Sequence, residues 1–208
     1  FIPVLEDTYL ICKIDYYVFE KVCETLDAWG QRGEPLVTIS SNFSRITFMD
    51  ENFVKRIKAI SDKYHVQREL LEIEITESAD CTDFGTLAAQ IHQIRAAGFQ
   101  VAMDDFGVES SNLALLSLVE FDVLKIDKGF VKDILSNKRA QTIIGTMARM
   151  CGELGIQLIA EGVEDEQQLS VLKEYGVKTV QGYLFSKPVS ISEYEKKYLG
   201  EAKMGSLI

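Results

Sequence analysis

The segments LLEIEIT (residues 70–76) and VLKID (residues 123–127) decide the fold class. Each is dominated by aliphatic residues, has near-continuous apolar character and ends in a polar residue. Strands of this kind are typical of a parallel sheet whose two faces are both covered by helices. The two segments therefore predict an α/β fold built on a parallel sheet.

The same pattern extends along the chain as six units, each a short apolar run followed by an amphipathic stretch of helical period. The expected strands are Leu36–Phe43, Leu70–Thr76, Phe99–Asp104, Val123–Ile126, Ile156–Ala160 and Thr179–Gln181. No linker or repeat divides the chain, so one domain over residues 1–208 is expected. The glycine-rich turns of open nucleotide-binding sheets are absent from the sequence, which favours most of a (β/α)8 barrel.

Composition narrows the function classes. The chain has 208 residues, 47% of them hydrophobic, and a net charge of -10, which disfavours nucleic acid polymers and anionic membranes as partners. No apolar run approaches the roughly 18 to 20 residues of a membrane span, and no signal peptide pattern occurs. We therefore expect a cytoplasmic location without membrane contact by this segment. The four cysteines lack paired spacing, so we expect reduced, mostly buried thiols.

Polar residues gather where the expected strands end. These residues are Asn42, Glu74, Glu77, Asp104, Asp105, Lys125, Asp127, Glu161, Glu164 and Gln181. In a barrel the carboxyl ends of the strands converge on one face, where the active site is built from several strands at once. The sequence thus predicts one cluster of oxygen ligands with a lysine among them.

Each of these residues also has an ordinary structural explanation. Asp105 is suited to cap a following helix, the acids from Glu164 to Glu166 suit the first turn of a helix, and Lys125 is suited to pair with Asp104. Gln181 fits a simple turn. Several carboxylates on one face, however, repel one another unless cations lie among them. The joint pattern therefore favours a metal site.

The ligand chemistry indicates the metal and the reaction. Oxygen ligands favour Mg²⁺ or Mn²⁺ over zinc, and His65 and His92 are expected to be surface or packing residues. The adjacent acids Asp104 and Asp105 suit a site in which one carboxylate bridges two ions, and Lys125 adds a fixed donor. Hydrolysis of a phosphodiester is the expected reaction class, while the substrate stays open at this point.

Seven ordered motifs carry a resemblance that spans nearly the whole chain: FIPVLED (1–7), SNFSR (41–45), LEIEITES (71–78), MDDFG (103–107), LKID (124–127), AEGVED (160–165) and QGYLFSKP (181–188). With them the sequence resembles the EAL-domain family, phosphodiesterases that hydrolyse the bacterial second messenger cyclic di-GMP to linear pGpG. The resemblance implies a TIM-like (β/α)8 barrel with one antiparallel strand. It also implies a homodimer formed through elements next to the DDFG loop.

The resemblance further implies roles for individual residues. Asn42, Glu74 and Asp104 would bind one ion, and Asp104 would bridge to a second ion held by Asp105 and Glu161. Lys125 would contact the catalytic water, so that Lys125, Glu161 and Asp104 form the catalytic group. Glu77 would brace the loop after Asp105. The remaining polar positions, Asp127, Glu164 and Gln181, would support the substrate or the loops.

Two departures from the family pattern affect these expectations. The glutamate of the EAL motif and the first one or two strands are expected upstream of FIP, where this chain begins, so the segment alone is expected to bind metal weakly or be inactive. The segment Val108–Asn112 lacks the usual T-G-aromatic run, which predicts a slow enzyme. The alternatives are a catalytically silent relative that binds cyclic di-GMP and signals to a partner, and a purely structural interaction domain. Sensory or cyclase domains often accompany this family.

Overall fold

The computed structural model describes residues 10–76, 84–107 and 113–199, and in these residues the expected strands form one six-stranded sheet. The strands are β1 (Ile39–Asn42), β2 (Leu71–Thr76), β3 (Gln100–Phe106), β4 (Val123–Ile126), β5 (Gln157–Ala160) and β6 (Thr179–Val180). They lie in chain order, each parallel to the next. The predicted parallel sheet is confirmed, and the implied antiparallel strand is not among the pairings of the described residues.

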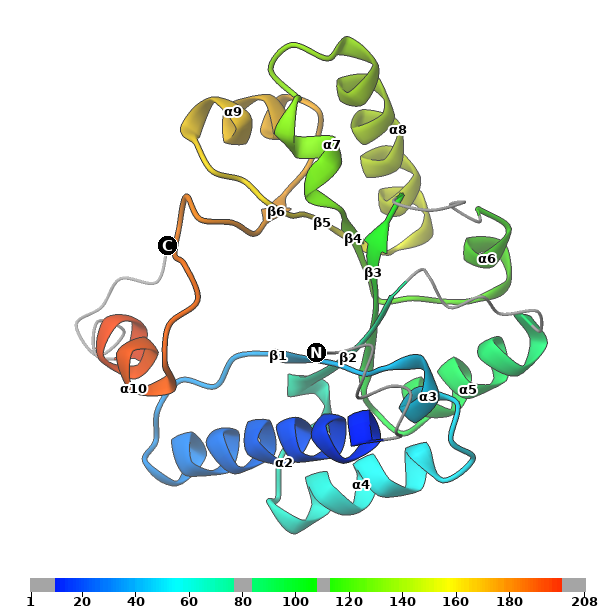
Figure 1. Cartoon of the computed structure of the whole chain (residues 1–208), viewed down its shortest axis with the longest axis vertical. Coiled ribbons are helices and arrows are strands. Elements are labelled where there is room, and N and C mark those ends of the chain that lie inside the picture. Colours follow the sequence, from blue (N-terminus) through cyan, green and yellow to red (C-terminus); the bar gives the residue numbers. More distant parts are fainter. Residues whose placement is uncertain (1–9, 77–83, 108–112, 200–208) are drawn as a thin grey trace.

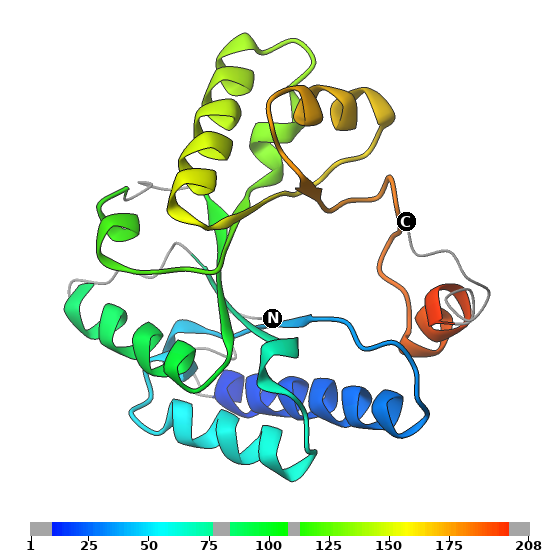
Figure 2. The same ribbon diagram turned by 180° about the vertical axis from the view of Figure 1, so that it is seen from behind.

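Helices surround the sheet, which curls so that its concave face looks inward (Figures 1 and 2). The helices are α2 (Leu10–Gln31), α3 (Arg45–Phe48), α4 (Phe53–Lys63), α5 (Phe84–Ala96), α6 (Leu113–Leu118), α7 (Lys128–Lys132), α8 (Lys138–Leu154), α9 (Glu166–Glu174) and α10 (Ile191–Tyr194). A 3₁₀ turn, η1 (Arg68–Leu70), precedes β2, and a π-helical turn, η2 (Glu195–Leu199), follows α10. This arrangement is that of a partial TIM-like barrel.

The hydrophobic core lies between the helices and the outer face of the sheet. On β2 the residues Leu71, Ile73 and Ile75 are buried in this core. Because side chains alternate along a strand, Glu72 and Glu74 belong to the opposite, inner face. The alternation of LLEIEIT therefore places apolar side chains under the helices and carboxylates inside the barrel.

Helix α8 shows how local sequence builds the outer layer. It buries four residues that are spaced three or four positions apart: Ala140, Ile144, Met147 and Cys151. Such spacing gives one apolar stripe that packs on the sheet. The side chain of Asn137 caps the first turn, and Gly155, with φ of 73°, ends the helix in the left-handed conformation that glycine tolerates.

The thiols and histidines of the described residues are where the sequence predicted them. Cys23 and Cys151 are buried free thiols, and burial raises the pKa of Cys151 to about 11. Cys12 is a partly buried free thiol, whereas Cys81 lies outside the described residues. His65 and His92 are exposed, away from the strand ends. In the described ranges no helix combines the length and apolarity needed to cross a membrane.

Candidate metal centre

Lys125 on β4 is the centre of the site. Its Nζ atom lies 3.0 Å from Oε1 of Glu74 on β2 and 3.2 Å from Oδ1 of Asp104 on β3. The same atom lies 2.7 Å from Oε1 of Glu161, the residue that follows β5. The lysine side chain is only 6% exposed. The carboxyl ends of four neighbouring strands thus meet around one buried ammonium group, as the strand-end pattern predicted.

A β-bulge brings both aspartates of the MDDFG motif to this point. Met103 pairs with Leu124, but the next pair is Phe106 with Ile126, so two residues of β3 oppose Lys125 alone. Asp105 has φ of 54°, a left-handed conformation that aspartate adopts more readily than most residues. Its N–H donates to Oδ1 of Asp104 at 2.9 Å. Bulges redirect side chains in this way beside functional sites.

Three carboxylates form a group able to hold a metal ion. One oxygen each from Asp104, Asp105 and Glu161 lies within 4.8 Å of the others. An oxygen-only donor set of this kind fits Mg²⁺ or Mn²⁺ and does not favour zinc. The residues present therefore fit the divalent cation that the sequence predicted.

Electrostatics explain why a cation would stabilise this group. Burial, followed by the charges of Asp104 and Asp127, raises the pKa of Asp105 above its ordinary value. Burial also raises the pKa of Glu161, although Lys125 acts in the opposite direction. Both carboxylates are thus held where ionisation is disfavoured. A bound cation favours the ionised form and relieves this cost.

Lys125 stays protonated despite its burial. Burial by itself would lower the pKa of Lys125, but the hydrogen bond to Glu161 and the charges of Glu74 and Asp104 raise it above the ordinary lysine value. A permanently charged ammonium group can donate hydrogen bonds and offset negative charge, but it cannot act as a general base. In the structure this ammonium group contacts the three carboxylates of Glu74, Asp104 and Glu161.

Asn42 joins the site from β1. Its Nδ2 donates to Oε2 of Glu74 at 2.8 Å, and the N–H of Phe43 donates to the carbonyl of Glu74. Asn42 and Glu74 are also register partners across the β1–β2 pair. The structure therefore brings together Asn42, Glu74, Asp104, Asp105, Lys125 and Glu161.

The supporting residues predicted from sequence have different positions. The side chain of Asp127 caps α7 by accepting from the N–H of Gly129 at 2.7 Å. Glu164 and Gln181 are exposed, and the backbone of Gln181 bonds Ala160 and Val163. Asp165 caps α9 and Glu166 lies in its first turn, which confirms the helix-start explanation for those two acids. Glu77 and the segment Val108–Asn112 lie outside the described residues.

Two polar residues near the site were missed by sequence reasoning. Glu72 is 7% exposed on the inner face, two residues before Glu74, and burial raises its pKa to about 7. The two-residue spacing in LEIE was the signal for it. Asp15 of α2 is also 7% exposed and accepts from the backbone N–H and the hydroxyl of Ser44 and from the hydroxyl of Thr47. It thereby fixes the turn that follows Asn42.

Comparison with known proteins places the chain among related sequences. The family model described as EAL domain matches residues 1–188. Signaling protein YkoW of Bacillus subtilis is 32% identical over 196 residues, which cover 94% of this chain and 24% of the relative. Cyclic di-GMP phosphodiesterase NbdA of Pseudomonas aeruginosa is 29% identical over 196 residues, which cover 94% of this chain and 25% of that relative. The chain spans about a quarter of the length of these curated relatives.

Solved structures share the fold. The EAL domain of Mycobacterium smegmatis DcpA matches with a TM-score of 0.84 and 32% identity, covering 89% of this chain and 83% of that one. Klebsiella pneumoniae BlrP1, in a manganese and cyclic di-GMP complex, matches with a TM-score of 0.77 and 26% identity. The match covers 85% of this chain and 44% of the BlrP1 chain. These matches confirm the fold expected from the sequence.

Proposed function

The chain belongs to the EAL domain family, and from this premise we propose that it hydrolyses cyclic di-GMP to linear pGpG in bacterial second-messenger signalling. A relative named as a cyclic di-GMP phosphodiesterase and a structural neighbour in complex with cyclic di-GMP support this substrate. The single observation that carries the proposal is the contact of Lys125 with three carboxylates at the strand ends. We assign this phosphodiesterase domain to residues 1–208.

Two divalent ions, Mg²⁺ or Mn²⁺, complete the proposed site. Asn42, Glu74 and Asp104 would hold one ion. Asp104 would bridge to the second, with Asp105 and Glu161 as its further ligands. When bound, the ions supply Lewis-acid activation of a water molecule and neutralise charge on the phosphodiester. The manganese complex of the Klebsiella neighbour supports a divalent ion in this fold.

The protein side chains orient the reactants. Lys125 is held by three carboxylates, so its ammonium group has a fixed position at the strand ends. Ions that took these carboxylates as ligands would free an N–H of Lys125 to donate to the attacking water, and its charge would offset developing negative charge. Asp104 and Glu161 fix that ammonium group and are the catalytic partners of Lys125. We propose that Glu77, Asp127, Glu164 and Gln181 support the substrate and the loops around it.

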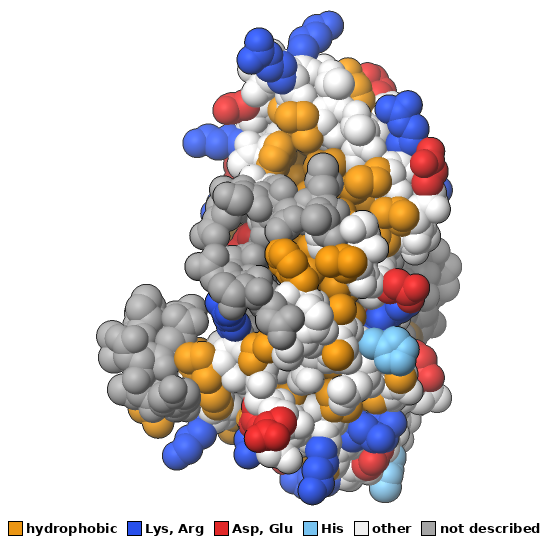
Figure 3. Space-filling view, turned by 90° about the vertical axis from the view of Figure 1, so that its right-hand side faces the viewer, with side chains coloured by type: hydrophobic (Ala, Val, Ile, Leu, Met, Phe, Trp, Pro, Cys, Tyr) orange, Lys and Arg blue, Asp and Glu red, His pale blue; other side chains and the backbone are white. Residues whose placement is uncertain are grey.

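A homodimer is the proposed assembly. An apolar groove of about 360 Å³ lies between the end of β3 and α8, and its lining includes Phe106, Phe130, Met147 and Met150. Figure 3 shows hydrophobic side chains gathered on the face that carries α6 and α8. Ile143 of this groove is 45% exposed. The groove adjoins the DDFG motif, which supports a second copy of the chain as its partner. We propose the cytoplasm as the place of action.

One observation favours a second candidate, a receptor that binds cyclic di-GMP without cleaving it. Lys125 already offsets part of the negative charge of Glu74, Asp104 and Glu161, so part of the charge compensation of the site does not require metal. A receptor would bind the nucleotide in the presence of EDTA. An enzyme would instead need Mg²⁺ or Mn²⁺ for turnover.

The decisive experiment is an assay of cyclic di-GMP hydrolysis by the natural full-length protein, followed by chromatography of pGpG. We expect turnover with Mn²⁺ or Mg²⁺ and none in EDTA. Asp104→Asn removes the bridging carboxylate and should reduce kcat by about 100-fold or more. Asp133→Asn, at the exposed end of α7, serves as the matched control and should leave kcat unchanged. Tight nucleotide binding in EDTA without turnover under any metal would contradict hydrolysis and favour the receptor.

A further inference from the structure

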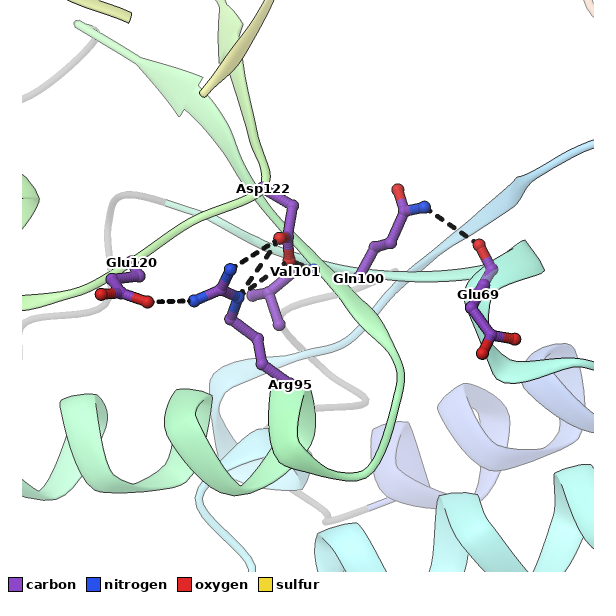
Figure 4. A network of polar contacts seen from close by, with 6 residues as sticks. All are labelled: Glu69, Arg95, Gln100, Val101, Glu120 and Asp122. Carbon is purple, nitrogen blue, oxygen red and sulfur yellow. Dashed lines mark hydrogen bonds and ion pairs between the residues drawn. The ribbon is translucent and has the colours of Figure 1, made fainter. Parts of the chain in front are cut away.

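A network of charged groups lies at the amino ends of β3 and β4, and Figure 4 shows its residues. The metal centre lies at the carboxyl ends of the same strands. Asp122 lies immediately before β4, three residues ahead of Lys125. Arg95 reaches it from the last turn of α5, and Val101 meets it from the start of β3. Three elements therefore meet at one carboxylate at the amino ends of the strands.

Asp122 joins three strands with its backbone and its side chain. Its N–H donates to the carbonyl of Val101 at 2.9 Å, and its carbonyl accepts from the N–H of Gln157 at 2.9 Å. Its Oδ2 accepts from the N–H of Val101, also at 2.9 Å. The carboxylate thus takes the place of a strand carbonyl just before β4 begins. Two hydrogen bonds therefore join Asp122 to Val101, one from the backbone N–H of Asp122 and one to its side chain.

Arg95 fixes the orientation of that carboxylate. Its Nε lies 3.2 Å from both oxygens of Asp122, and its Nη2 lies 3.0 Å from Oδ1. The planar guanidinium group restricts the carboxylate to one plane, which an ammonium group would not do. The side chain of Asp122 is 28% exposed and that of Arg95 is 33% exposed, so water competes only partly for these hydrogen bonds.

The pairing of β3 with β4 explains why the hydrogen bonds between Asp122 and Val101 matter for the metal centre. Only two regular pairs, Ala102 with Val123 and Met103 with Leu124, separate Asp122 from the bulge. At the bulge the register shifts, so Lys125 has no regular pairing partner on β3. Its position along the strand direction relative to Asp104 and Asp105 is therefore not fixed by a regular pair at that point. On the β3 side, Lys125 is held between the two pairs next to Asp122 and the pair of Phe106 with Ile126 beyond the bulge. On its other side it pairs regularly with Ile159 of β5. Loss of the Asp122 contacts would leave the β3 side of Lys125 fixed mainly by the pair beyond the bulge.

We infer that Asp122, oriented by Arg95, is a positioning residue that sets the register of β4 against β3 and thereby the fit of Lys125 to the carboxylates of the metal centre. The kinetic part of this inference rests on the proposed function. The part that concerns metal affinity does not, because it can be measured on a protein without turnover.

The chain provides a matched control two residues away. Glu120 binds the same arginine, with its Oε2 at 2.5 Å from Nη1 of Arg95. Its side chain, however, is 87% exposed, and it precedes the segment that touches Val101. Glu120→Gln removes a similar charge from Arg95 while leaving the hydrogen bonds between Asp122 and Val101 in place.

The test compares Asp122→Ala, Asp122→Asn and Glu120→Gln in the natural full-length protein, by calorimetric titration with Mn²⁺ and by kcat and KM for cyclic di-GMP. We expect Asp122→Ala to weaken Mn²⁺ affinity and kcat by about tenfold, the lower end of the effects found for residues that support metal ligands, with KM changed less, because a shift of β4 against β3 would move Lys125 relative to the carboxylates. Asp122→Asn keeps an acceptor for the N–H of Val101 and should recover part of both. Glu120→Gln should stay within about twofold of the wild type.

Circular dichroism establishes that each variant is folded. A folded Asp122→Ala protein with wild-type Mn²⁺ affinity and kcat would overturn the inference, as would equal losses in Asp122→Ala and Glu120→Gln. If Asp122→Ala does not fold, Asp122→Asn and Arg95→Gln decide the matter by the same comparison. If the wild type shows no turnover, the proposed function fails, whereas the Mn²⁺ titrations still test the positioning role.

Discussion

At the scale of single residues, Glu72 is a side chain whose acidity is strongly altered by the fold. It lies on the inner face of β2 and is 7% exposed. Burial, followed by the charge of Glu74, raises its pKa to about 7. The folded protein therefore retains a proton on Glu72 at pH values where the unfolded chain has lost it. Stability must fall as the pH rises from the ordinary carboxyl range to about 7.

Replacing this residue tests that linkage. In EDTA, we expect the wild type to lose about 1 to 3 kcal/mol of unfolding free energy between pH 5 and pH 8 relative to Glu72→Gln, which cannot ionise. Urea unfolding at the two pH values measures the difference. Glu69→Gln, an exposed neighbour in the turn before β2, is the control and should follow the wild type. Parallel pH dependence of wild type and Glu72→Gln would rule out a raised pKa at Glu72.

The clustering of polar residues at the strand ends could be predicted from the sequence. The buried hydrogen bonds between residues of different helices could not. Glu74, Asp104, Lys125 and Glu161 follow apolar runs, and parallel pairing forces those ends together. Asp15 lies within a helical stretch, and its bonds to Ser44 and Thr47 arise only from the packing of α2 against α3. Such partners depend on tertiary contacts that no local pattern encodes.

At the scale of elements, the turn after β6 depends on one glycine. A Cβ atom on Gly182 would lie 2.1 Å from the carbonyl oxygen of Val163. That backbone cannot easily withdraw, because the N–H of Val163 donates to Gln181 and its carbonyl accepts from Leu184. The turn after β6 thus packs closely on the loop after β5. This contact fixes the position of the loop that begins with Glu161.

Gly182→Ala should therefore destabilise the protein by about 1 to 3 kcal/mol through steric overlap with backbone. Gly152→Ala is the matched control, since nothing lies within 4 Å of a Cβ atom at that position of α8. It should instead stabilise the helix by about 0.5 to 1 kcal/mol. Urea unfolding of both variants measures these free energies, and equal effects at the two glycines would contradict the close approach at Gly182.

Element positions followed from the sequence more closely than element ends. All six strands lie where apolar runs predicted them, but β1 begins at Ile39 and not at Leu36. Strand β3 continues to Phe106, two residues beyond the predicted end at Asp104. The extension exists because the bulge at Asp104 and Asp105 lets pairing resume at Phe106. A bulge is a property of two paired strands, so one strand's sequence does not predict it.

At the scale of the whole molecule, the curled sheet explains how separate sequence motifs form one site. Asn42, Glu74, Asp104 and Lys125 are far apart in the chain, yet they lie on successive strands of one parallel sheet, and Glu161 directly follows the next strand. The net charge of -10 means that an anionic dinucleotide gains no general attraction from the protein. Under the proposed function, binding of such a substrate would depend on Lys125 and on divalent ions at the strand ends.

The most direct test is anomalous diffraction from crystals of the natural full-length protein grown with Mn²⁺. We predict two manganese peaks about 3.5 to 4 Å apart at the carboxyl ends of the strands. Asp104 should contact both ions, Asn42 and Glu74 one of them, and Asp105 with Glu161 the other. Absence of manganese there, with Lys125 still bound to its three carboxylates, would contradict the metal centre.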